Sequence, residues 1–291
     1  MNSLGSYHLA YSEKKEKRKT KFAYHLRLVA GQLIIRLANY PVKGEIYFLQ
    51  KEDENMLVHG AQKMGINLHE EQIRKFSRYL ELLFQWNQTI NLTSLNTPQE
   101  IIVKHFLDSI SCVKVINKHF STKGMSVIDV GTGAGFPGMP IKIVCPSISL
   151  SLLEARKKKT IFLEKIIKEI HFQKVKILNG RAEALGKCPD YRQKYDIVLS
   201  RALAPLSTLS EYCLPLARVG GLFIAQKGRS YREEIDKALK AVHFLGGELI
   251  GVENVRIPFI DQERYLLIIK KIKDTPSKYP RKAGVPQKRP L

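Results

Sequence analysis

The feature that most constrains the fold is the glycine-rich stretch at residues 127–138, VIDVGTGAGFPG. Its first four residues predict a short buried strand, with Asp129 near the carboxyl end. The strand is followed by three glycines that alternate with small residues: Gly131, Gly133 and Gly135. Glycines at such a turn let backbone N–H groups approach a ligand with no Cβ in the way. Since ligands of open α/β sheets bind beyond the carboxyl ends of the strands, we predict a nucleotide-type cofactor site here.

Two cofactors are compatible with this stretch. Gly133, Gly135 and Gly138 satisfy the dinucleotide pattern G-x-G-x-x-G, which is a weak signal when it stands alone. The spacing Asp-x-Gly-x-Gly-x-Gly that begins at Asp129 instead resembles motif I of S-adenosylmethionine (SAM) dependent methyltransferases. Pro137 favours SAM, because a pyrophosphate needs a free helix N-terminus at that point. A strand-to-helix turn with purely structural glycines is the third possibility.

Further along the chain, strand patterns alternate with helix patterns, which predicts a mainly parallel, doubly wound α/β sheet. The predicted strands are residues 127–130, 148–154, 175–178, 195–200 and 221–226, with helices over 160–170 and 206–216. Two final apolar runs, 249–257 and 265–272, predict a hairpin, so one of its strands must run antiparallel to the others. A parallel sheet closed by such a hairpin favours the Rossmann-like SAM-methyltransferase architecture over a dinucleotide-binding one. The second strand ends in Glu154, where an acid can bind the ribose of either cofactor.

The sequence before the sheet predicts a small helical region. Asn67 and Glu70 have capping-box spacing, and a helical apolar pattern follows to about Gln88. Thr97 followed by Pro98 predicts the start of another helix. Compact patterning begins only at Met56, so residues 1–55 are expected to be a disordered or non-native basic extension rather than an RNA-gripping arm. The predicted organisation is extension 1–55, helical lead-in 56–122, methyltransferase core 123–273 and basic, proline-rich, irregular tail 274–291.

The formal net charge of the 291-residue chain is +21 and is concentrated at the ends. Residues 1–43 contain nine Lys/Arg against two acids, and residues 264–291 contain nine against one. This distribution favours a polyanionic partner such as nucleic acid, although basic tails can also serve solubility alone. The four cysteines are scattered, so neither a disulfide framework nor a metal site is expected, and a reducing, cytoplasmic compartment is the expectation. No run reaches the ~18 apolar residues of a membrane span.

Several motifs together resemble the RsmG family, once called GidB. They are WNQTINLTS (86–94), KHFLDS (104–109), VIDVGTGAGFPGMPIKI (127–143), GRAEAL (180–185), DIVLSRALAPL (196–206) and YPRKAGVPQKRPL (279–291). The resemblance runs from about Met56 to Leu291 and implies SAM-dependent methylation of N7 of a single guanine in bacterial 16S ribosomal RNA. The implied partner is that RNA, the small ribosomal subunit or an assembly intermediate, with no membrane, and the protein is expected to be a monomer. Another RNA or a small molecule as substrate, a dinucleotide-dependent oxidoreductase and a non-catalytic RNA-binding module remain the alternatives.

The resemblance also implies site residues. The cofactor-binding residues that it implies are Gly131, Phe136, Glu154, Ala182, Glu183 and Arg201, and the motif I spacing of the glycine loop adds Asp129, Gly133 and Gly135. The substrate-positioning residues that it implies are Asn91, His105, Arg181 and Arg201. Guanine N7 carries an exposed lone pair, so the reaction needs alignment of the two reactants and no general base.

Each of these residues also has a structural alternative. We expect Arg181 and Arg201 to grip the RNA phosphate or the guanine edge, unless they form ion pairs with acids at the sheet end. His105 could equally be a satisfied core histidine, and Asn91 could fix the NLTS turn. Glu183 and Asp129 are the counter-charges available to a cationic donor.

Overall fold

The computed structural model describes residues 24–29, 32–37, 50–121 and 123–291, and the chain divides into two compact units. The first unit, Met1–Glu45, contains two antiparallel strands, β1 (Tyr24–Val29) and β2 (Gln32–Leu37). The second unit, Ile46–Leu291, contains all the other elements. Most of the predicted extension 1–55 lies outside the described residues, and the proposed segment boundaries stay a prediction. Helix α1 (Lys51–Lys63) begins before Met56, the residue at which the apolar pattern becomes regular.

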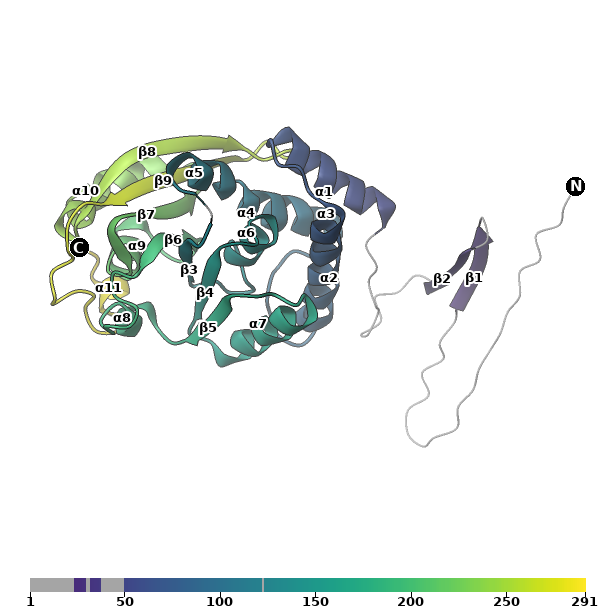
Figure 1. Ribbon diagram of the computed structural model, residues 1–291, viewed down its shortest axis with the longest axis horizontal. Coiled ribbons are helices and arrows are strands. Elements are labelled where there is room, and N and C mark those ends of the chain that lie inside the picture. Colours follow the sequence, from purple (N-terminus) through teal and green to yellow (C-terminus); the bar gives the residue numbers. More distant parts are fainter. Residues whose placement is uncertain (1–23, 30–31, 38–49, 122) are drawn as a thin grey trace, which may run out of the picture. The chain divides into compact units, whose positions relative to one another are not determined.

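A seven-stranded sheet forms the centre of the second unit, in the order β5-β4-β3-β6-β7-β9-β8 (Figure 1). Its strands are β3 (Ser126–Val130), β4 (Ser149–Glu154), β5 (Val175–Asn179), β6 (Tyr195–Arg201), β7 (Ala217–Lys227), β8 (Gly247–Arg256) and β9 (Glu263–Lys271). Neighbouring strands are parallel, except that β9 is antiparallel to both β7 and β8. This confirms the doubly wound sheet with a closing antiparallel hairpin, the architecture of SAM-dependent methyltransferases. The strand order reverses between β3 and β6, which is where such sheets bind ligands.

Both faces of the sheet are covered by helices (Figure 1). One face packs against α2 (Glu70–Asn87), α6 (Gly138–Val144) and α7 (Lys157–Glu169), and the other against α9 (Leu206–Cys213) and α10 (Tyr231–Phe244). Successive side chains of a strand point to opposite faces, so Val127 joins the first core and Ile128 the second. Burial on both faces explains why these strands appear in the sequence as continuous apolar runs.

The helical lead-in differs from its prediction at the start of α2. The helix begins at Glu70 with His69 as its N-cap residue, so the predicted capping pair of Asn67 and Glu70 is wrong. The Gln72 side chain accepts a hydrogen bond from the His69 N–H (2.9 Å) and donates one to the Ile143 carbonyl (3.0 Å). The glutamine therefore closes the helix start and also ties α2 to the end of α6.

The second lead-in helix begins as predicted, because the Thr97 hydroxyl accepts the Glu100 N–H. The helical run then continues through α3 (Pro98–Ile101), the π-helix η1 (Ile102–Leu107), α4 (Asp108–Ile110) and α5 (Cys112–His119). A π-helical turn is rare and often occurs at functional sites. This one carries His105.

Two features of the carboxyl-terminal half were not anticipated. Helix α10 was not predicted, because its buried positions include the alanines Ala238 and Ala241, which give little apolar contrast. The tail, residues 274–291, has only the short helix α11 (Val285–Lys288) as regular structure and lies against α9 and the short helix α8 (Ala182–Leu185) (Figure 1).

None of the helices in the described part of the chain combines the length and apolarity needed to cross a bilayer.

Candidate active site

The glycine loop after β3 is held closed by Asp129. Its carboxylate is fully buried, and Oδ2 accepts hydrogen bonds from the Thr132 hydroxyl (2.6 Å) and the Gly138 N–H (2.9 Å). Between Asp129 and Gly138, three residues have left-handed φ angles that glycine adopts without strain: Gly131 (71°), Gly133 (61°) and Gly135 (100°). Burial raises the pKa of Asp129 to about 6, although both hydrogen bonds oppose this shift. The acid in the motif therefore shapes the loop.

Glu154 connects the end of β4 to the same loop. Its Oε2 accepts the Gly133 N–H (3.0 Å) and its Oε1 accepts the Arg156 N–H (2.8 Å). The Gly131 N–H donates in turn to the Leu153 carbonyl (2.9 Å). Glu154 thus lies at the carboxyl edge of β4, beside the loop, where an acid can accept ribose hydroxyls.

Within the described part of the chain, the atoms nearest to a Cβ added at Gly131 or Gly133 belong to flexible side chains. A Cβ on Gly131 would lie 2.7 Å from the tip of Leu203, a side chain that is 42% exposed. A Cβ on Gly133 would meet nothing nearer than the Lys159 ammonium at 3.6 Å. An approachable backbone flanked by Glu154 fits the methionine and ribose parts of SAM. The residues that would hold it are those of the glycine loop, Glu154, Ala182 and Glu183.

A third element at this end of the sheet is α8, which follows β5. Ala182 and Glu183 are both buried, and Glu183 Oε1 accepts the Gly284 N–H from the tail (2.9 Å). Arg181 precedes the helix as its N-cap residue, with an exposed side chain. It forms no ion pair with any residue in the described ranges, so its guanidinium is available to an anionic partner.

Arg201, at the end of β6, lies in a cluster of charges. Its Nη1 donates to Asp108 Oδ2 (3.0 Å) and to the Lys104 carbonyl (3.2 Å). Asp108 is 4% exposed at its side chain, and its Oδ1 lies 3.3 Å from Arg264 Nε. One buried carboxylate therefore orients two arginines. The structural alternative anticipated for Arg201, an ion pair with an acid, is present, and the acid belongs to the lead-in.

His105 lies between this cluster and the glycine loop. Its Nδ1 is 3.2 Å from Arg201 Nη2, and its Nε2 is 2.8 Å from the Thr93 hydroxyl. Burial and the positive charge of Arg201 lower the pKa of His105 to about 3, so the imidazole is neutral at physiological pH. The ring stacks on Phe136 at a centroid distance of 4.5 Å, and Phe136 in turn stacks on Tyr79.

The remaining predicted site residues are Phe136 and Asn91. Phe136 is only 6% exposed and lies in this aromatic stack, so its predicted contact with the donor stays a prediction. Asn91 is exposed, and the turn around it is held by Asn87, whose Oδ1 accepts the N–H groups of Leu92 (2.8 Å) and Thr93 (2.9 Å).

The residues that hold the cluster together were not predicted from the sequence. Asp108 stands within the quoted KHFLDS motif, where an acid after His105 on an otherwise apolar helical face was a usable signal. Thr93 likewise stands within a quoted motif. Arg264 gives no such signal, because it is one of many basic residues near the end of the chain.

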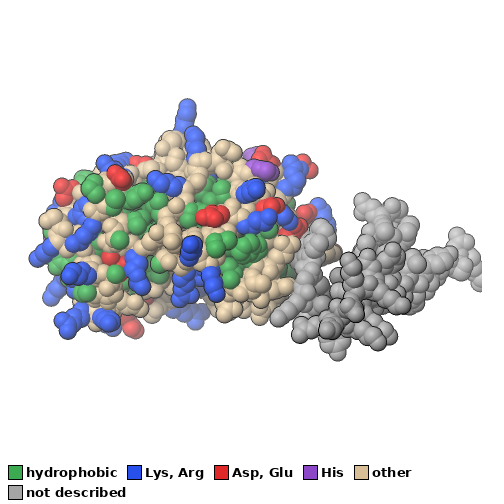
Figure 2. Space-filling model, turned by 90° about the horizontal axis from the view of Figure 1, so that it is seen from below, with side chains coloured by type: hydrophobic (Ala, Val, Ile, Leu, Met, Phe, Trp, Pro, Cys, Tyr) green, Lys and Arg blue, Asp and Glu red, His purple; other side chains and the backbone are tan. Residues whose placement is uncertain are grey.

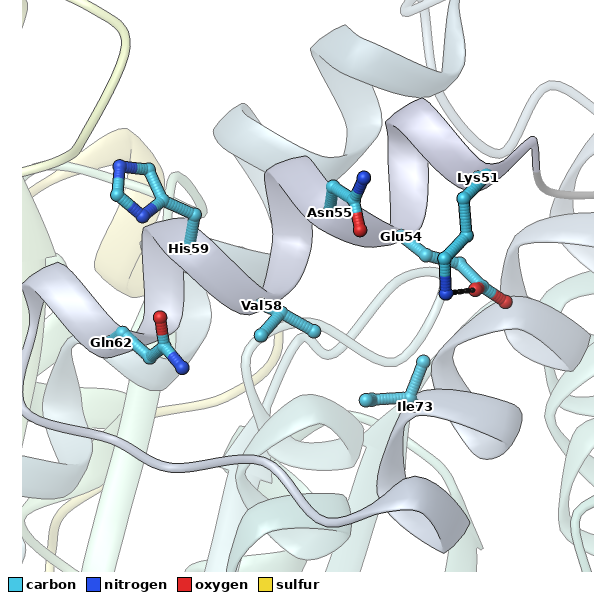
Figure 3. A pocket seen from close by; sticks show the side chains of 7 residues that line it. All are labelled: Lys51, Glu54, Asn55, Val58, His59, Gln62 and Ile73. Atoms are coloured by element: carbon cyan, nitrogen blue, oxygen red, sulfur yellow. Dashed lines mark ion pairs between the residues drawn. The ribbon is translucent and has the colours of Figure 1, made fainter.

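Three pockets of about 430, 570 and 710 Å³ lie elsewhere. The first lies between α1 and α2, where Val58 and Ile73 face each other and the Lys51–Glu54 ion pair lies at one end (Figure 3). None of the three borders the glycine loop. Lys and Arg side chains are spread over the face of the second unit shown in Figure 2, so the basic character extends beyond the chain ends.

Comparison with known proteins agrees with the resemblance found in the sequence. The family model GidB, rRNA small subunit methyltransferase G, matches residues 72–265. A ribosomal RNA small subunit methyltransferase G of Alkaliphilus oremlandii is 47% identical over 240 residues, covering 82% of this chain and 99% of the relative. One of Acetivibrio thermocellus is 47% identical over 236 residues, covering 81% and 96%. A SAM-dependent methyltransferase structure from Aquifex aeolicus aligns with TM-score 0.45 and 16% identity, over 62% of this chain and 97% of that one. With the family model and the curated relatives in agreement over most of its length, the chain belongs to the rRNA small subunit methyltransferase G family.

Proposed function

We propose that this protein uses SAM to methylate N7 of a single guanine in 16S ribosomal RNA of the small subunit. The observation that carries the proposal is the open glycine loop beside Glu154, at the point where the strand order reverses. Such a crevice fits a nucleoside-type methyl donor. The relatives' names supply the small-subunit rRNA as substrate class.

The choice of N7 is supported by the chemistry of the cleft. When bound, SAM supplies a sulfonium methyl group that a lone pair can attack. The cleft residues Arg201 and Arg181 are permanently cationic, and His105, with its pKa lowered to about 3, is a weak base. An exocyclic amine or a ribose hydroxyl would need help in losing a proton, whereas guanine N7 needs none. The proposed catalytic strategy is therefore alignment of the two reactants.

The arginines of the site are assigned to the RNA and the acids to the methyl donor. Asp108 holds Arg201 with its guanidinium toward His105, which suits a fixed contact with guanine O6, where the N7 lone pair stays free to attack, or with the target phosphate. Exposed Arg181 suits the RNA backbone. The acids Glu154 and Glu183 line the donor side, where positive charge is present before transfer. A guanine within a helix would have to leave its stack to reach this cleft.

The test is transfer of labelled methyl groups from SAM to RNA isolated from cells that lack this gene. The substrates are 16S rRNA, assembled small subunits and, as a control, transfer RNA. We expect 7-methylguanosine at one position of 16S rRNA. Label in transfer RNA alone, or at a different atom, would favour the alternative of another RNA substrate. Label in none of them, with SAM bound, would favour a small-molecule methyltransferase or a non-catalytic RNA-binding module.

Arg201→Ala provides the sharpest variant for this assay. Because Asp108 keeps Arg264 as a partner, the variant should still fold cooperatively. It should lose about 100-fold or more in kcat/KM, as expected when a reacting group is no longer held in line. Arg218→Ala is the matched control, since Arg218 pairs with Asp196 at the start of β6, whereas Arg201 lies at the end of that strand. Equal activity of the two variants would remove Arg201 from the site.

A further inference from the structure

The carboxyl-terminal tail is anchored by an arginine that the proposed chemistry does not use. Glu211 of α9 is fully buried, and both of its carboxylate oxygens accept hydrogen bonds from Arg281. The closest of these joins Arg281 Nη2 to Oε2 at 2.6 Å, and the Arg281 backbone N–H adds another to Oε1 at 2.7 Å. A buried carboxylate is stable only when it is paired in this way, so α9 depends on the tail.

A second arginine connects the tail to the end of α8. Arg192 donates to the Gly186 carbonyl (2.6 Å) and to the tail carbonyls of Tyr279 (2.8 Å) and Thr275 (2.6 Å). The fit at this point is close, because a Cβ on Gly186 would lie 2.9 Å from Pro280. The tail and the end of α8 therefore share a close contact.

The third anchor reaches the donor side of the site directly. The Gly284 N–H donates to Glu183 Oε1 (2.9 Å), and the buried Thr208 hydroxyl of α9 donates to the Pro286 carbonyl (3.2 Å). Helix α8 has only four residues, too few to be stable without packing partners. The position of Glu183 is therefore set by what packs on α8, and the tail supplies a direct hydrogen bond to its carboxylate.

We infer that the tail is a positioning element of the methyl-donor site, in which the Arg281–Glu211 pair fixes Gly284 so that Gly284 orients Glu183. This inference rests on the proposed SAM-dependent function, because it assigns Glu183 to the donor side. Arg281 is a positioning residue. It acts through Gly284 and Glu183 and lies outside the reacting centre. Loss of this pair frees Gly284 and leaves Glu183 able to turn toward the exposed cation of neighbouring Arg181.

The test is SAM binding to the full chain by calorimetry, without RNA, for wild type, Arg281→Ala and Arg218→Ala. We expect the Kd for SAM to rise about tenfold in Arg281→Ala and to be unchanged in the Arg218 control, which breaks an arginine–carboxylate pair at the other edge of the sheet. In methyl transfer, the KM for SAM should rise in the same proportion while kcat at saturating SAM stays within about twofold. Amide hydrogen exchange of residues 182–187 in the SAM-free variant should accelerate.

A second variant keeps the inference falsifiable if Arg281→Ala fails to fold. Arg281→Ala combined with Glu211→Gln removes the pair without leaving an ionised carboxylate buried, and it should show the same loss of SAM affinity. Wild-type SAM affinity and wild-type exchange of residues 182–187 in a folded variant would overturn the inference. Failure of the wild type to bind SAM would overturn the proposed function instead.

Discussion

The two sides of the proposed site, a donor side at the glycine loop and a substrate side at Arg201, are built differently. On the donor side, Asp129 and Glu154 accept hydrogen bonds from backbone N–H groups of the glycine loop. On the substrate side, the Asp108 carboxylate pairs with the side chains of Arg201 and Arg264, which come from β6 and β9. The donor side is thus a local backbone shape fixed by acids, whereas the substrate side is a charge cluster assembled from distant segments. We therefore expect the donor side to respond to changes in backbone conformation and the substrate side to changes in charge.

The largest expected effect tests the backbone shape of the donor side. A Cβ on Gly135, where φ is 100°, would lie 2.5 Å from the Tyr79 hydroxyl and 2.8 Å from Met139 Sδ. Gly135→Ala should cost about 3 kcal/mol of unfolding free energy, from backbone strain and displaced neighbours. Gly133→Ala is the matched variant in the same loop, and its open surroundings limit the cost to about 1 kcal/mol. Urea unfolding measures both. Equal losses of unfolding free energy in the two variants would mean that the close contacts of Gly135 with Tyr79 and Met139 add no cost.

The next prediction concerns how the stability contributions of Asp129 and His105 depend on pH. Because burial raises the pKa of Asp129 to about 6, its contribution to stability is present below its ordinary pKa of 3.8 and is lost as the pH rises through 6. Over this pH range the contribution of Asp129 to the unfolding free energy falls by on the order of 3 kcal/mol. The pKa of His105 is lowered from 6.5 to about 3, so its contribution is present above pH 6.5 and is lost as the pH falls. The two sides should therefore respond to acid with opposite signs.

Unfolding free energies between pH 4 and pH 7 separate these contributions. The difference between wild type and Asp129→Asn should shrink as the pH rises toward 6, while the difference between wild type and His105→Gln should grow. Parallel profiles for the two variants would contradict the opposite pKa shifts.

The smallest expected effect on stability concerns Arg181, the exposed cation at the N-cap of α8. Arg181→Gln should change the unfolding free energy by less than about 0.5 kcal/mol, because its side chain is exposed and forms no ion pair with the residues described. It should weaken RNA binding and reduce the slope of log affinity against log salt concentration by about one. Filter binding over a series of salt concentrations measures both quantities. An unchanged slope would place Arg181 away from the phosphates.

The donor side could be predicted from the sequence because its chemistry is local. The glycines, Asp129 and the strand before them lie in one stretch of chain, and Glu154 follows from the next strand. The parallel sheet with its closing hairpin was also predictable, since buried strands leave continuous apolar runs and the final hairpin has a polar turn.

The substrate side and the tail could not be predicted in the same way. Apolar periodicity carries no information on which arginine meets which carboxylate, and Asp108 meets partners on β6 and β9 that lie far along the chain. The tail has the composition of an irregular segment, and its proline content conceals its anchoring. One signal was available, because Glu211 stands in the otherwise uncharged helix α9, where a buried acid requires a partner.

The Tyr79 hydroxyl of α2 donates to the Ala134 carbonyl within the glycine loop (2.5 Å), and the Tyr79 ring packs flat against Phe136. The floor beneath the donor loop is therefore contributed by a helix that precedes the sheet in sequence. A sheet separated from the lead-in would lose this support of its glycine loop. Any minimal catalytic unit cut from this chain has to retain α2.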